Sequence, residues 1–75
     1  MERKTTLREL REQSGKTRAE VANALRVSIA ALSHYELGVR RIDIVQVLIL
    51  SKLYDAGAEE IIEAQLSSIS VRKTN

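Results

Sequence analysis

The 75-residue sequence contains no cysteine and no proline, only three glycines and a single histidine. Without cysteine there are neither disulfides nor thiolate metal sites, and no oxidising compartment is implied. His34 has no partners at the spacing of metal ligands, so we expect no metal ion. The glycines form no phosphate-binding loop, and Ser33 and His34 are adjacent on a helix and point apart. We therefore expect neither an enzyme nor a cofactor.

A long hydrophobic segment is also missing. The longest apolar run, residues 42–50, is interrupted by Asp43 and Gln46, and it is far shorter than the roughly 20 residues that span a bilayer. Residues 1–6 contain no apolar stretch of the signal-peptide type. We therefore expect a cytoplasmic protein that does not contact a membrane.

Charge is nearly balanced overall but unevenly distributed. The net charge is +2. Residues 1–41 hold nine Lys or Arg against five Asp or Glu (net +4), whereas residues 42–75 hold three against five (net −2). The N-terminal half therefore suits a polyanionic partner, and the C-terminal half does not.

The absence of proline and the scarcity of strand signals predict an all-helical chain with breaks near the glycines. Thr17 and Glu20 form a capping box at the start of one helix, and Ser28 can cap the next. Asp43 and Gln46 form a weaker capping box before a further helix. The predicted helices cover about residues 5–13, 17–25, 28–37, 43–54, and 58–65 or slightly beyond.

The helices predicted within residues 17–37, with the short turn between them, form the most specific pattern in the chain. Ala22 supplies a small residue where the second helix crosses the first, and Val27 supplies an apolar anchor in the turn. Leu32 and Tyr35, three residues apart, place core residues on one side of the second helix, so its other side faces outward. Reading the DNA major groove requires such a two-faced helix.

Residues 17–38 resemble the helix-turn-helix of the Cro/repressor-type (Xre-like) regulators. The family pattern consists of Gln-x-Glu-Leu-Ala, a Gly-Val-Ser turn, Ile-Ser-x-x-Glu and a glycine. In this chain the corresponding segments are, in the same order, Arg-Ala-Glu-Val-Ala (18–22), Arg-Val-Ser (26–28), Leu-Ser-His-Tyr-Glu (32–36) and Gly38. The resemblance extends from Leu7 to about Tyr54. It implies an all-α, compact five-helix, lambda-repressor-like DNA-binding domain over residues 1–66, followed by a polar tail at residues 67–75.

The sequence departs from the family pattern at three positions. Arg26 replaces the turn glycine, and if this position has a positive φ we expect strain of about 1 kcal/mol. Arg18 replaces a glutamine but can still hold a phosphate, and Ile42 replaces a common proline. The resemblance also implies an ion pair between Arg11 and Glu36; the alternative is that both side chains are solvated.

The outward face of the second motif helix holds the expected groove contacts, which are Ser28, Ile29, Ala30, Ser33 and His34. Ile29 and Ala30 can touch a thymine methyl group, and Ser33 and His34 can bond to a base edge or a phosphate. The set lacks the usual bidentate base readers, so we expect DNA shape to contribute to specificity. Alternatively, Ile29 and Ala30 pack or contact a protein, and His34 is a surface residue without a role.

Four basic residues flank this face and are expected to hold phosphates: Lys16, Arg18, Arg40 and Arg41. Such contacts orient a protein on DNA but carry no sequence information. The alternative is a solvated charged surface, although the positive charge lies on the half of the chain that carries the motif.

The fourth predicted helix is apolar around most of its circumference, so it needs cover on most sides. We expect a homodimer through the fourth and fifth helices, bound to double-stranded DNA with half-sites about 34 Å apart. Alternatively, the fifth helix folds back and covers the fourth within one chain. In the tail, Ile69 and Val71 alternate with serines, which fits a short strand across the dimer; otherwise the tail is disordered.

The function predicted from these patterns is that of a sequence-specific DNA-binding transcriptional regulator, a repressor-like homodimer on a two-fold operator without a small-molecule ligand. Two alternatives remain. The apolar outward face also fits a protein-interaction module on a helix-turn-helix scaffold. An antitoxin would combine DNA binding with capture of a toxin by the tail from Ser67.

Overall fold

Side-chain caps define where the first four helices begin. The computed structural model describes residues 5–73, with side chains for residues 5–70. In this part of the chain it contains five α-helices, α1 (Leu7–Gln13), α2 (Arg18–Leu25), α3 (Ile29–Glu36), α4 (Ile44–Leu53) and α5 (Ala58–Lys73). Thr6, Thr17 and Asp43 each form a full capping box, and the Ser28 hydroxyl accepts a hydrogen bond from the Ala31 N–H. These caps satisfy helix N–H groups that would otherwise have no partner. The predicted all-α fold is confirmed.

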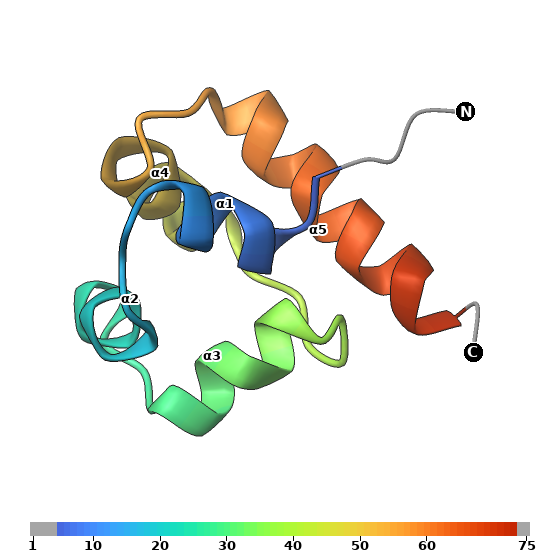
Figure 1. Cartoon of the computed structure of the whole chain (residues 1–75), viewed down its shortest axis with the longest axis horizontal. Coiled ribbons are helices and arrows are strands. Elements are labelled where there is room, and N and C mark those ends of the chain that lie inside the picture. Colours follow the sequence, from blue (N-terminus) through green and yellow to red (C-terminus); the bar gives the residue numbers. More distant parts are fainter. Residues whose placement is uncertain (1–4, 74–75) are drawn as a thin grey trace.

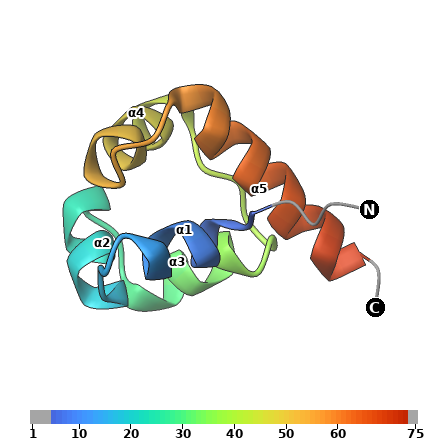
Figure 2. The ribbon, with the colours of Figure 1, turned by 45° about the horizontal axis from the view of Figure 1, so that its top comes forward.

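All five helices contribute to a single core. Helix α5 packs against α4 and α1, and α2 packs against α3 and α4 (Figure 1). Turned by 45°, the molecule has α4 and the start of α5 on one side and α1, α2 and α3 on the other (Figure 2). The buried apolar side chains are Leu7, Leu10, Val21, Ala22, Leu25, Leu32, Tyr35, Ile42, Val47, Leu50, Tyr54, Ile61 and Ala64.

Helix α5 is longer than the sequence analysis predicts. It runs from Ala58 to Lys73, so residues 67–73 of the predicted 67–75 tail are neither a disordered segment nor a strand, and residues 74 and 75 lie outside the described residues. The helix continues because the face that α5 buries includes a polar residue, which a search for apolar residues does not find. Ile61, Ala64 and Ser68 are spaced by three and four residues and are all buried. The Ser68 hydroxyl is satisfied there, since it donates to the Ala64 carbonyl (2.9 Å) and accepts from the Leu7 N–H (3.1 Å).

Helix α4 is only partly covered by α5. Val47 and Leu50 are buried in the core, whereas Ile44, Val45 and Leu48 are exposed. Helix α5 leaves Ile62 and Leu66 exposed as well. The fifth helix therefore does fold back onto the fourth, but several apolar side chains of both helices stay exposed to solvent.

Candidate nucleic-acid interface

The connection between α2 and α3 is three residues long. Arg26 ends α2 in the left-handed conformation, with φ 59° and ψ 44°. This is the positive φ for which the family pattern uses glycine, and it costs a non-glycine residue about 1–2 kcal/mol. The Val27 N–H donates to the Ala22 carbonyl (3.0 Å), and the partly buried Val27 side chain packs against the core. Ser28 then caps α3, so the turn fixes the direction in which α3 leaves α2.

Helix α3 has one buried and one exposed face, as its sequence predicts. Leu32 and Tyr35 are buried in the core. On the other side, Ala30 and His34 are exposed, and Ile29 is 52% exposed. Of the two remaining predicted groove residues, Ser28 is exposed and Ser33 is half-buried. Ile29, Ala30 and His34 are therefore exposed on α3, whereas Ser28 precedes the helix as its cap and Ser33 is only partly accessible.

A buried ion pair fixes the end of α3 against α1. The Arg11 Nε lies 2.7 Å from a Glu36 carboxylate oxygen, and the two side chains are 9% and 5% exposed. Arg11 also donates from Nη1 to the Lys16 carbonyl (3.2 Å). The hydrogen bond to Glu36 raises the pKa of Arg11 against the opposing effect of burial. The predicted pair is confirmed, and it ties α1, α3 and the turn before α2 together.

Two of the four predicted phosphate-binding residues, Arg18 and Arg40, lie against the last turn of α3. The Arg18 Nε lies 3.8 Å from Glu36, with about half of the Arg18 side chain exposed. The Arg40 guanidinium lies over the Tyr35 ring, 5.4 Å from its centroid. Of the other two, Lys16 is half-buried and Arg41 is exposed. The side chains of Arg18 and Arg40 are thus both held against residues of α3.

A family model described as a helix-turn-helix domain matches residues 5–64. The chain belongs to this helix-turn-helix family. The match covers most of the chain and confirms the resemblance found in residues 17–38. Neither the comparison with curated proteins nor the comparison with solved structures finds a significant match.

The helix-turn-helix contains contacts that sequence reasoning missed. Arg18 was expected to be free for phosphate, but it also approaches the buried carboxylate of Glu36. The Gln46 side chain, expected only as a capping residue, also donates to the Tyr35 hydroxyl (3.2 Å). The stacking of Arg40 on Tyr35 was also not foreseen. No sequence signal distinguishes these pairs, because each joins residues whose proximity depends on the tertiary fold.

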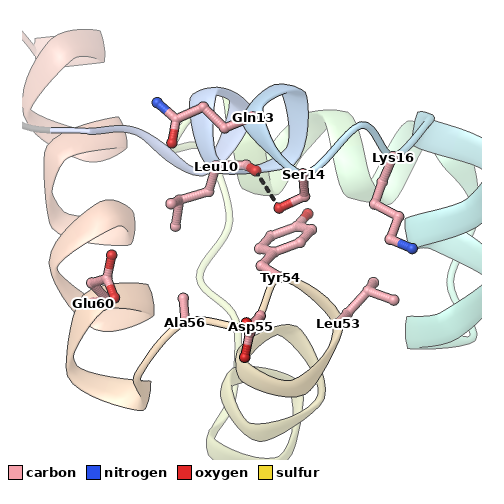
Figure 3. Close-up of a pocket in the computed structure, with 9 residues that line it drawn as sticks. All are labelled: Leu10, Gln13, Ser14, Lys16, Leu53, Tyr54, Asp55, Ala56 and Glu60. Carbon is pink, nitrogen blue, oxygen red and sulfur yellow. Dashed lines mark hydrogen bonds between the residues drawn. The ribbon is translucent and has the colours of Figure 1, made fainter.

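A pocket of about 470 Å³ lies on another part of the helix-turn-helix domain, between the end of α1, the end of α4 and the start of α5 (Figure 3). Tyr54, directly after α4, reaches toward Ser14, the residue that follows α1, and burial raises the pKa of the Tyr54 hydroxyl. The lining residues are Leu10, Gln13, Ser14, Lys16, Leu53, Tyr54, Asp55, Ala56 and Glu60. Lys16 belongs both to this pocket and to the predicted phosphate contacts.

Within residues 5–73, no helix is long and apolar enough to cross a membrane. The same part of the chain contains no group of three or more His, Cys, Asp or Glu side chains that could hold a metal ion.

Proposed function

We propose that this protein is a sequence-specific DNA-binding transcriptional regulator of the Cro/repressor (Xre-like) type. The observation that carries the proposal is the two-faced helix α3. Leu32 and Tyr35 anchor it in the core, and Ile29, Ala30 and His34 are left exposed on the second helix of a helix-turn-helix. A helix in this position enters the major groove and reads base edges with its exposed side chains.

The proposed phosphate contacts are Lys16, Arg18, Arg40 and Arg41. Arg18 and Arg40 lie beside the last turn of α3, so they are close to any backbone that flanks a groove occupied by this helix. The partial ion pairing of Arg18 with Glu36 does not oppose this role. Its side chain stays about half exposed, and Glu36 already has Arg11 as its principal partner.

We further propose a homodimer on a two-fold operator, with a repressor-like action. The support for a dimer is the exposure of apolar side chains on α4 and α5 in the single chain: Ile44, Val45, Leu48, Ile62 and Leu66. Apolar residues that are exposed in a monomer and lie next to one another typically mark protein–protein contacts. Two copies related by a two-fold axis would present their α3 helices to successive major grooves about 34 Å apart.

The first experiment is a salt series of binding to random-sequence duplex DNA, followed by selection of the bound sequences. We expect a steep salt dependence and an enriched two-fold motif. The variant Arg18→Ala with His34→Ala should weaken binding, whereas Lys52→Ala removes a charge from the last turn of α4 and should have a much smaller effect. If the unmodified chain does not bind duplex DNA at low salt, the proposal is refuted.

A protein-interaction module is the second candidate, and a specific observation favours it. Half of the Ile29 surface is exposed on α3, and the groove face carries no bidentate base reader. Such a module would bind a protein through α3 or α4 and bind duplex DNA weakly or not at all. The salt series separates the two candidates. For an antitoxin, toxin capture by a free tail is unsupported over residues 67–73, which belong to α5.

A further inference from the structure

The connection between α3 and α4, residues 37–43, carries Arg40 and Arg41 and lies against the second half of α5 (Figures 1 and 2). Its first contact is made by Gly38, which has φ +79°. A Cβ at this position would lie 2.6 Å from the Ser68 carbonyl oxygen and 2.8 Å from the Ile69 Cα. The two backbones therefore touch directly, and only glycine allows the contact.

The second contact lies at the other end of the connection. The Ile42 N–H donates to the Gln65 side-chain oxygen, across 23 residues of sequence. Ile42 is buried, so its N–H has little access to water, and the Gln65 amide is its partner. The next residue, Asp43, is held in the capping box of α4 with Gln46. Arg40 and Arg41 thus lie between two points at which α5 holds the backbone.

We infer that Gln65 is a positioning residue for the phosphate contacts of Arg40 and Arg41. Its hydrogen bond to Ile42 fixes the backbone immediately after the two arginines, while the Tyr35 ring supports the Arg40 guanidinium from α3. A connection that is ordered before binding loses less conformational entropy when its side chains engage a ligand. This inference rests on the proposed function and adds that α5, outside the helix-turn-helix, sets the affinity of the DNA interface.

The test uses the full chain and a random-sequence duplex at low salt. Gln65→Ala removes the acceptor for the Ile42 N–H and should weaken binding by about 3- to 10-fold, as expected for the cost of ordering one or two long side chains on binding. Ser70→Ala changes an exposed residue on the same helix and serves as the matched control. Gln65→Glu keeps an acceptor oxygen, so the Ile42 amide should exchange as slowly as in the unmodified chain. Circular dichroism establishes that each variant is folded at the temperature of the assay.

A double-mutant cycle separates positioning from general destabilisation. If Gln65 acts through the arginines, Gln65→Ala should have no further effect on binding in a chain that carries Arg40→Ala and Arg41→Ala. Equal losses in both backgrounds would overturn the inference, as would unchanged binding by Gln65→Ala in the chain that keeps both arginines. Failure of the unmodified chain to bind any duplex would instead refute the proposed function, and the inference with it.

Discussion

Removing the carboxylate of Glu36 should cost a large share of the stability of this domain. The Glu36 and Arg11 side chains are only 5% and 9% exposed, and their closest approach is 2.7 Å. Losing one partner of a buried pair leaves the other charge without compensation, which costs about 3–5 kcal/mol. Glu36→Gln keeps the shape and one acceptor oxygen, so we expect a loss near 3 kcal/mol. The total free energy of unfolding of a domain of this length is typically about 4–11 kcal/mol.

Helix α1 also supplies the matched control. Arg8 and Glu12 form an ion pair of the same type with Nε and Oε2 at 3.1 Å, but their side chains are 61% and 51% exposed. Glu12→Gln should therefore change the free energy of unfolding by less than about 0.5 kcal/mol. Urea unfolding at neutral pH, with a common m-value, measures both changes. If Glu36→Gln costs no more than Glu12→Gln, the α1–α3 pair does not contribute as its burial implies.

Three further predictions concern stability. Leu32→Ala removes a buried side chain of α3 and should lower the free energy of unfolding, measured in urea, by about 2–5 kcal/mol. Ile29→Ala, on the exposed face, should change it by no more than about 0.5 kcal/mol. Similar losses for the two variants would show that α3 is not packed as described. Arg26→Gly relieves the strain of the left-handed backbone, and the greater entropy of glycine in the unfolded chain offsets part of this gain. The variant should therefore be more stable by about 0.5–1 kcal/mol. A lower thermal midpoint would contradict this. The hydrogen bonds that Glu20 shares with Thr17 lower the pKa of Glu20, so its stabilising effect is present above the ordinary carboxyl pKa and is lost as the pH falls through the lowered value. Glu20→Gln should therefore reduce the decline of the thermal midpoint in acid, and an unchanged decline would exclude Glu20 as a contributor.

The parts of the structure that depend on local physics follow directly from the sequence. Thr17, Ser28 and Asp43 start their helices because their side-chain oxygens reach N–H groups three residues on, within a single turn. The two faces of α3 follow from the spacing of Leu32 and Tyr35, because a helix has 3.6 residues per turn. The exposure of Ile29, Ala30 and His34 on the other side of α3 follows from the same spacing.

The end of α5 was not predictable in this way because its buried stripe is completed by a serine. Sequence patterns identify a buried face by its apolar residues, so Ile61 and Ala64 are recognised and Ser68 is not. Ser68 is buried because the Leu7 N–H and the Ala64 carbonyl satisfy its hydroxyl. The alternation of Ile69 and Val71 with serines resembles a strand, but the helix is the observed structure.

The arrangement of the basic residues likewise does not follow from the charge pattern. The sequence indicates Arg18 and Arg40 because they are basic and flank the motif, but the positions of their side chains depend on Glu36 and Tyr35. Glu36 is in turn buried and held by Arg11, 25 residues away along the chain. A charge pattern can therefore indicate that a face suits a polyanion, whereas the position of each guanidinium is set by buried polar contacts that only the tertiary fold creates.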